Sequence, residues 1–127
     1  MWLITNFGFF SVVRKTADGG HLTVRARVRD DLDRLRQTYL PTLSTTIHGG
    51  GTDYPYRASA PASAVAAAFT KAIQDIDYSN FKNEATAKLG AARGKVYGHV
   101  LAALFDLTNL GAAKAKPPKK QGRIQPA

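Results

Sequence analysis

The sequence predicts one α+β domain, built on an antiparallel sheet of about four strands in the order ββαββα and closed by a long third helix. The 127 residues suffice for one ordinary domain. Strand-like segments come in adjacent pairs, and each pair precedes a helical pattern, which favours hairpins over βαβ units. A long segment with helical periodicity follows the second pair. We expect the domain to span residues 1–111 and a flexible basic tail to span residues 112–127.

The first strand pair occupies residues 2–29. Residues 2–15 are rich in aromatic and β-branched side chains and are predicted as one strand, apolar on both faces and therefore covered on both sides. An Asp-Gly turn within residues 16–20 leads into residues 21–29, where apolar and polar side chains alternate as in a half-buried strand.

The first predicted helix follows directly. Asp30 or Asp31 is the expected N-cap, because acidic residues suit the positive end of the helix dipole, and Pro41 ends the helix. Its apolar stripe comprises Leu32, Leu35, Tyr39 and Leu40.

The second unit repeats this architecture without evident sequence identity. Residues 43–48 and 54–59 are predicted strands, joined by a loop that contains three glycines. A second helix is predicted from about Pro61 to about Ile76, with Ser59 or Ala60 as its cap. Its apolar stripe comprises Val65, Phe69, Ala72, Ile73 and Ile76.

A third helix is predicted from about Glu84 to about Leu110, with three glycines on one face at Gly90, Gly94 and Gly98. Each glycine inside a helix costs about 1 kcal/mol relative to alanine, so these glycines indicate close approach to another backbone. That backbone belongs either to this chain or to a second copy, which would make a homodimer. A helix broken near Gly90 or Gly94 is the alternative. The predicted core stripe is Leu89, Val96, Val100, Leu104 and Leu107.

The chain is strongly basic, with 18 Lys and Arg residues against 9 Asp and Glu residues and a net charge of +9. Residues 114–127 contain no acid and carry five of the positive charges, on Lys114, Lys116, Lys119, Lys120 and Arg123. Such a tail indicates attraction to a polyanion, namely nucleic acid, an anionic membrane or an acidic protein surface. A tail that only increases solubility is the alternative.

Several classes of site are excluded or not expected. The absence of cysteine excludes disulfides, cysteine-based zinc sites and thiol catalysis. The three histidines have no spacing that specifies a metal or catalytic site, and we expect neither a metal nor a cofactor. No apolar run reaches the roughly 18 residues of a membrane helix, and no signal peptide is recognisable, so a cytoplasmic location is expected.

A stripe of arginines is the first candidate site. Arg25, Arg27 and Arg29 occupy alternate positions of the second predicted strand, so their side chains should share one sheet face about 7 Å apart. Arg57 on a neighbouring strand could extend the patch. Such a row of like charges requires a counter-charge, which could be phosphate or the acids of a covering helix. We therefore predict a polyanion-binding face, with a solvated face or an internal salt-bridge lattice as the alternatives.

A polar cluster follows the triple-glycine loop. The loop lacks the spacing of a P-loop and joins two predicted strands, so it does not match a known phosphate-binding motif. Arg57 could clamp either Asp53 or a ligand anion. The members of this cluster are Asp53, Tyr54, Tyr56 and Arg57.

A second polar cluster lies between the second and third predicted helices. Asp77 follows the negative end of a helix dipole, which suggests a specific partner such as Lys82 or Arg57. Capping of a short turn by Asp77 is the alternative. We predict that Asp53, Arg57 and Asp77 converge in space. The members of this cluster are Asp77, Tyr78, Asn80 and Lys82.

Several segments together resemble a family of small bacterial proteins for which no activity is established. They are Trp2-Leu3-Ile4-Thr5, Gly8-Phe9-Phe10-Ser11-Val12-Val13, Val24-Arg25-Ala26-Arg27, Thr52-Asp53-Tyr54-Pro55-Tyr56-Arg57 and Asp77-Tyr78-Ser79-Asn80-Phe81-Lys82, followed by Tyr97 and the apolar run to Leu107. The resemblance covers about residues 1–110. It implies that the polar clusters belong to one shared design and that the basic tail is an addition particular to this chain.

These observations favour a non-enzymatic protein that binds nucleic acid or a nucleoprotein through an arginine-rich sheet face and the lysine-rich tail. Two alternatives remain open. One is an adaptor or phage-type inhibitor that binds an acidic protein surface. The other is an enzyme that acts on a phosphate-bearing substrate through Asp53, Arg57 and Asp77.

Overall fold

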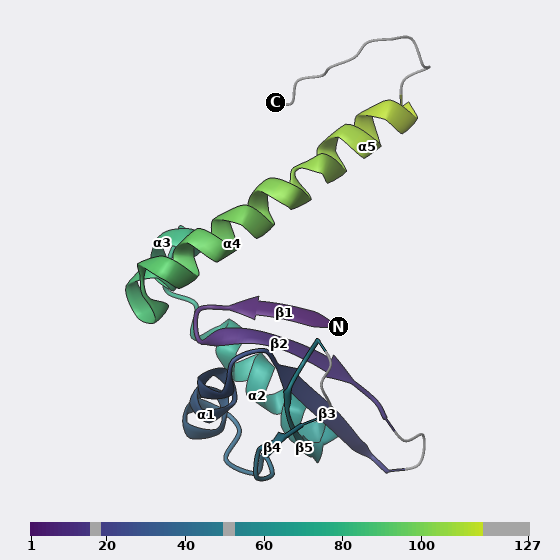
Figure 1. The fold of residues 1–127 in the computed structure, drawn as a ribbon, viewed down its shortest axis with the longest axis vertical. Helices are drawn as coiled ribbons and strands as arrows, with labels where there is room; N and C mark the ends of the chain where they lie inside the picture. The colour runs from purple at the N-terminus through teal and green to yellow at the C-terminus, as the bar shows by residue number, and fades with distance from the viewer. Residues whose placement is uncertain (16–18, 50–52, 116–127) are drawn as a thin grey trace.

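The computed structural model describes residues 1–15, 19–49 and 53–115, and it shows a sheet layer, a helical layer and a projecting arm (Figure 1). The elements in chain order are β1 (Trp2–Thr5), β2 (Gly8–Val13), β3 (His21–Ala26), α1 (Arg29–Thr38), β4 (Ile47–His48), β5 (Tyr56–Pro61), α2 (Ala62–Gln74), α3 (Phe81–Leu89), α4 (Ala91–Leu104) and α5 (Asp106–Ala115). The strands form one antiparallel sheet in the order β1-β2-β3-β5-β4. The predicted α+β class is therefore confirmed, whereas the count of about four strands and the order ββαββα are wrong.

The fifth strand arises because the segment predicted as one strand, residues 2–15, folds into β1 and β2. Thr5 makes the turn between them: its hydroxyl donates to the carbonyl of Gly8 at 2.7 Å and accepts from the amide of Phe7 at 3.1 Å. Gly8 has a φ of +151°, a conformation that side-chain-bearing residues rarely adopt. The sequence did not indicate this turn, because apolar residues occur on both sides of it throughout residues 2–15.

The hydrophobic core lies between one sheet face and the two helices α1 and α2. Phe10, Val24 and Ala58 are buried on the middle strands of the sheet. The helices contribute the buried residues Leu32, Leu35, Val65 and Ala68. The predicted stripe of the first helix is confirmed, since Leu40 is also buried and Tyr39 packs against the core.

Both of these helices begin differently from the prediction. Val28 is the N-cap of α1 and makes no side-chain cap hydrogen bond, so Asp30 and Asp31 lie inside the first turn. Pro61, whose φ of −55° suits a helix start, is the N-cap of α2. At the other end of α2 the predicted stripe is wrong, because Ile73 is 68% exposed and nothing in the described chain covers it.

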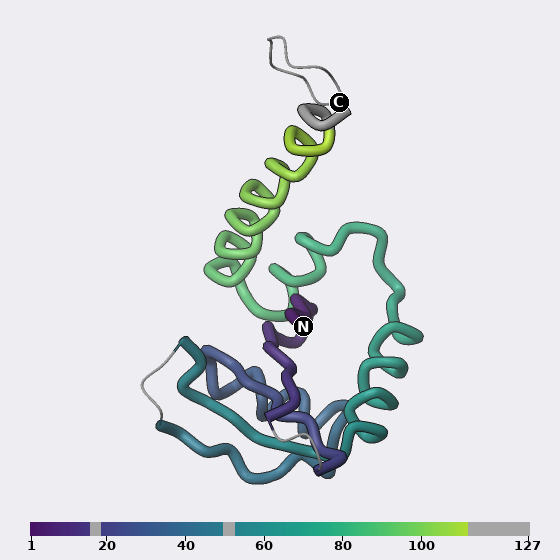
Figure 2. Tube along the Cα trace, turned by 90° about the vertical axis from the view of Figure 1, so that its right-hand side faces the viewer, coloured from purple at the N-terminus to yellow at the C-terminus, as the bar shows by residue number. Residues whose placement is uncertain are grey.

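The third predicted helix is broken at Gly90, which has a φ of +101°, so the alternative of a break is confirmed. The segments α3 and α4 fold back on each other, and α4 and α5 together form a rod that points away from the sheet (Figures 1 and 2). We call α3, α4 and α5 the arm. The arm does not close the sheet, because Val96, Leu104 and Leu107 are each at least half exposed. The predicted core stripe is therefore wrong for these residues.

Gly94 shows why α4 needs a glycine. A Cβ atom there would collide with Oγ1 of Thr86 on α3, whereas Gly98 has only the Lys82 side chain within contact distance, at 3.8 Å. The close backbone approach at Gly94 is thus made within the chain. A homodimer through the face of Gly90, Gly94 and Gly98 stays a prediction.

The predicted domain boundary at residue 111 stays a prediction. The helix α5 continues to Ala115, past the expected end of the domain at residue 111. The rest of the predicted tail lies outside the described residues. Among the described helices, none combines the length and the apolar character that a membrane crossing requires.

Replacing Gly94 with leucine tests the contact between α3 and α4. Because the new side chain has no room beside Thr86, we expect Gly94→Leu to lower the free energy of unfolding by about 1–3 kcal/mol. Gly98→Leu is the matched control and should cost less, since its neighbour is a flexible lysine. Thermal melts of both variants measure the difference, and equal melting temperatures would contradict the packing argument.

Candidate nucleic-acid interface

One row of side chains crosses the whole sheet. Antiparallel pairing places its members directly opposite one another on successive strands, and we call this set the arginine row: Trp2, Ser11, Arg25, Arg57 and Ile47. Directly paired residues share a face, and their sequence neighbours point to the other face. Since Phe10, Val24 and Ala58 are buried under α1 and α2, the row lies on the opposite side, which we call the free face.

Arg25 and Arg57 are cross-strand partners at the centre of this row. Like charges directly opposite each other destabilise a sheet unless a counter-charge is present. Arg25 is half-buried, and its Nη2 donates to the hydroxyl of Ser11 at 2.7 Å. No carboxylate forms an ion pair with Arg25 within the described chain, and its buried Nε has no hydrogen-bond partner there. No carboxylate in the described part of the chain therefore neutralises the positive charge of Arg25.

Arg25 and Arg27 contact the aromatic ring of Tyr54 instead of a carboxylate of the described residues. The guanidinium carbon of Arg25 lies 4.6 Å from the centroid of this ring, and that of Arg27 lies 5.1 Å from it. A cation–π contact stabilises a guanidinium without cancelling its charge. Tyr54 is buried, and the guanidinium groups of both arginines pack against its ring.

Aromatic rings continue from Tyr54 to the edge of the sheet. Phe9 lies 6.3 Å from Tyr54, and Trp2 lies 6.1 Å from Phe9 with the two ring planes at 85°. Exposure increases along this series: Tyr54 is buried, Phe9 is half-buried and Trp2 is 70% exposed. The free face thus combines cations at its centre with an exposed indole at its edge.

The predicted stripe of three arginines on one strand is corrected by the structure. The strand β3 ends at Ala26, and Arg29 is the first residue of α1, so Arg29 does not continue the stripe. Arg27 follows the strand and still contacts Tyr54. The cations that the structure brings together are Arg25, Arg27 and Arg57, from β3, the residue after it and β5.

The first polar cluster divides between the two sides of the sheet. Tyr54 lies on the free face, whereas Tyr56 packs against the core and stacks on His48 with ring centroids 4.8 Å apart. Asp53 is exposed in the segment before β5. Tyr56 is therefore not part of the arginine site.

The second polar cluster serves the start of α3. Asn80, not Asp77, is the N-cap, and its side-chain oxygen accepts from the amide of Asn83 at 2.9 Å. Asp77 and Lys82 are exposed and form no ion pair with each other. Burial raises the pKa of Tyr78, and the negative charges of Glu84 and Asp77 raise it further. The convergence of Asp53, Arg57 and Asp77 stays a prediction.

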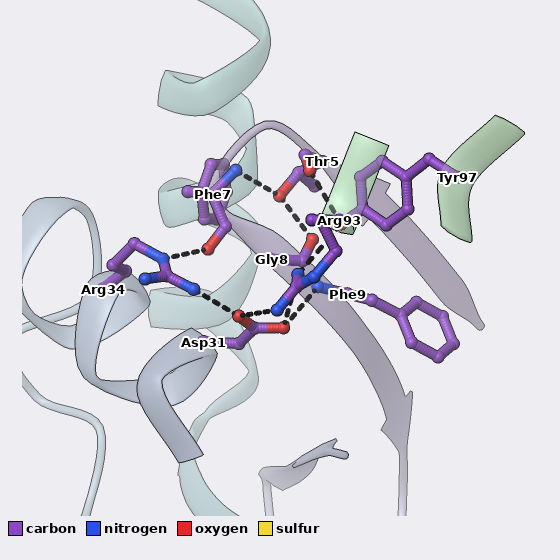
Figure 3. Close-up of polar contacts among 8 residues, drawn as sticks. All are labelled: Thr5, Phe7, Gly8, Phe9, Asp31, Arg34, Arg93 and Tyr97. Atoms are coloured by element: carbon purple, nitrogen blue, oxygen red, sulfur yellow. Dashed lines mark hydrogen bonds and ion pairs between the residues drawn. The ribbon is translucent and has the colours of Figure 1, made fainter. Parts of the chain in front are cut away.

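A buried cluster around Asp31 was not predicted from the sequence (Figure 3). Asp31 is only 1% exposed, and its two oxygens accept four hydrogen bonds. Oδ1 accepts from Arg34 at 2.5 Å and from Arg93 at 3.0 Å. Oδ2 accepts from the amide of Phe9 at 3.0 Å and from Arg93 at 3.1 Å. With these four bonds the lone pairs of Asp31 are filled, so it is not available as a general base or metal ligand.

The same cluster attaches the arm to the turn between β1 and β2. Tyr97 donates its hydroxyl proton to the carbonyl of Thr5 at 3.1 Å, and Asn6 donates to Glu84 at 2.9 Å. Arg93 lies 3.4 Å from the Tyr97 hydroxyl. Burial lowers the pKa of Arg93, but the hydrogen bonds to Asp31 and Tyr97 and the charges of these two groups together outweigh this effect, and the net shift is upward. Ala85 and Tyr97 of the arm are buried, but among the described residues neither joins the hydrophobic cluster between the sheet and the helices α1 and α2, so polar contacts carry much of the attachment.

No group of three or more potential ligands, counted over the described residues, is arranged to hold a metal ion. No protein-family model, no curated protein and no solved structure matches the chain. The resemblance to a family of small bacterial proteins therefore stays a prediction.

Replacing Asp31 with asparagine tests the buried cluster. We expect Asp31→Asn to lower the free energy of unfolding by about 3 kcal/mol, because two guanidinium groups lose their counter-charge. Asp33→Asn is the matched control on the same helix: it removes a more exposed pair with Arg36, for which we expect a loss of about 1 kcal/mol or less. Urea denaturation measures both values. Similar losses in the two variants would show that Asp31 is not a special constraint.

The phenol of Tyr97 makes the stability depend on alkaline pH. Burial raises its pKa in the folded protein above the ordinary value of about 10. The unfolded chain therefore ionises first, so this stabilisation is complete below about pH 10 and is lost as the pH rises through the folded pKa. We expect the wild type to lose more stability than Tyr97→Phe between about pH 8 and about pH 10.5. Urea denaturation at both pH values checks this, and parallel losses would contradict it.

Proposed function

We propose that the protein binds nucleic acid through the free face of its sheet, with Arg25, Arg27 and Arg57 contacting phosphate groups. The observation that carries this proposal is the cross-strand pairing of Arg25 with Arg57, at a place where no carboxylate forms an ion pair with Arg25 in the described chain. A polyanion supplies the counter-charge that no carboxylate of the described residues gives to Arg25.

The chemistry of the side chains suits phosphate. A guanidinium group presents a planar set of donors that can bind two phosphate oxygens at once. Ser11 and Tyr54 hold Arg25 in place, so less conformational freedom is lost when an anion binds. The net charge of +9 adds long-range attraction to any polyanion.

The predicted tail adds contacts of a different kind. Its cations are Lys114, Lys116, Lys119, Lys120 and Arg123. A lysine acts as a point charge and reads no base, so the tail would increase affinity without selecting a sequence. Any selectivity would come from the sheet.

An acidic protein surface is a weaker candidate for the partner. Carboxylates could neutralise Arg25, but carboxylates alone do not stack on the exposed indole of Trp2. Nucleic acid offers both phosphates and aromatic bases, and the free face carries both cations and aromatic rings. The candidate enzyme requires Asp53 and Asp77 to meet at Arg57, and both acids are exposed on segments outside the sheet, which suits a buried catalytic pair poorly.

Salt titrations separate the sheet from the tail. We expect Arg25→Ala/Arg57→Ala to flatten the slope of log K against log salt by about 1.4–1.8, at roughly 0.7–0.9 for each phosphate that is no longer neutralised. Deleting residues 114–127 should flatten it by up to about 3.5–4.5, equally for unrelated sequences. Fluorescence polarisation with labelled DNA and RNA measures both slopes, and thermal melts confirm that the variants fold.

The control is Lys71→Ala, because Lys71 is an exposed cation of α2 that already pairs with Asp75 at 2.6 Å. It should leave the slope nearly unchanged. If the full-length protein binds neither DNA nor RNA at low salt, the proposed function is wrong, and the adaptor for an acidic protein becomes the better account.

A further inference from the structure

We infer that the ligand of the free face is single-stranded nucleic acid, with one base stacked on the indole of Trp2 and the neighbouring phosphates bound by Arg25 and Arg57. This inference rests on the proposed function and specifies its substrate class. It uses one observation that phosphate binding alone does not explain, the exposed tryptophan at the end of the arginine row.

Trp2 is exposed, but its backbone is held in place. Its backbone belongs to β1, which pairs in register with β2. At the chain terminus the Met1 amino group donates to the carbonyl of Val12 at 2.9 Å, and the amide of Val12 donates to the carbonyl of Met1 at 2.8 Å. Phe9 packs against the indole, with the two ring planes at 85°. A large aromatic ring that is 70% exposed and fixed at its base is a ready platform for stacking.

The spacing of the row places the platform and the cations within reach of one short strand. Trp2 and Arg25 are separated by β2, so their backbones lie roughly 10 Å apart, and Arg57 lies about 5 Å beyond Arg25. Ser11, between them, has a small side chain that is covered by its neighbours, among them the Arg25 guanidinium group that donates to its hydroxyl. A backbone running from β1 towards β5 would therefore meet the indole first and the two guanidinium groups next.

A duplex does not fit this combination. Paired bases are stacked on one another inside the helix, so a flat sheet face could reach only the phosphates of a duplex. Unpaired bases expose their faces, and a base stacks on an aromatic side chain whatever its sequence. The presence of an exposed indole and guanidinium groups on one sheet face thus favours a single strand of nucleic acid, bound with little sequence preference.

The protein provides its own probe, since Trp2 is the only tryptophan. Titrations would compare a thymine oligonucleotide, a duplex of equal length and inorganic polyphosphate, with Trp2 fluorescence and polarisation of a labelled oligonucleotide as the two readouts. We expect the oligonucleotide to quench Trp2 and to bind more tightly than the duplex. Polyphosphate should compete for the site without quenching.

Variants of Trp2 identify the platform. We expect Trp2→Ala to weaken binding of the oligonucleotide about tenfold or more while leaving competition by polyphosphate unchanged, and Trp2→Phe to restore part of the loss. Leu101→Ala is the control, because Leu101 is a similarly exposed apolar residue on the arm.

The outcomes separate this inference from the proposed function. If nucleic acid binds but Trp2→Ala has no effect, or if the duplex binds as tightly as the single strand, the stacking inference is overturned and phosphate binding by the arginines stands. If neither nucleic acid nor polyphosphate binds, the proposed function itself fails. Quenching by an acidic polypeptide in that case would identify a protein partner.

Discussion

The carboxylate of Asp31 holds three parts of this fold in one arrangement. It accepts from the amide of Phe9 at the start of β2, from Arg34 on its own helix and from Arg93 on the arm. Gly8 makes this possible, since a Cβ atom at that position would lie 2.7 Å from the Asp31 side chain. A charge buried to this degree is tolerable only because two guanidinium groups and an amide surround it. The positions of the first hairpin, the first helix and the arm thus all depend on one side chain.

That constraint bears on the free face as well. The hairpin of β1 and β2 carries Trp2, Phe9 and Ser11, and Asp31 fixes the point where β2 begins. The alternation of side chains along β3 determines the direction of Arg25. Val24 and Ala26 are buried under the helices, so Arg25 between them must point to the other face. The cations of the sheet are therefore consequences of core packing on the opposite side.

Local patterns predicted much of the body from the sequence. The stripe of Leu32 and Leu35 predicted the buried face of α1, and the alternation around Arg25 predicted the two faces of β3. Both predictions succeeded because each pattern depends on residues close together in the chain. The pairing of Asp31 with Arg93 spans 62 residues, and an acid in the first turn of a helix already has a local explanation, so nothing in the sequence indicated it. Arg25 and Arg57 were both predicted for the patch, but their direct pairing depended on the register between β3 and β5, which no local pattern determines.

The arm shows a different limit of sequence patterns. Helical periodicity indicates which side chains share a face but not whether another surface covers that face. Leu104 and Leu107 fit a core stripe, yet they are at least half exposed on the rod. The sequence around Gly90 allowed two interpretations, a close backbone contact along one continuous helix or a break between two helices. The positive φ of Gly90 shows that the helix breaks there.

The polar attachment of the arm has a thermal consequence. Burial of apolar surface gives unfolding its large positive heat capacity, whereas exposure of polar surface lowers it. Hydrophobic stabilisation of the body therefore weakens on cooling, while hydrogen bonds such as those from Arg93 and Tyr97 lack that dependence. The sheet and the arm are in this sense two parts with different temperature responses, joined at the carboxylate of Asp31.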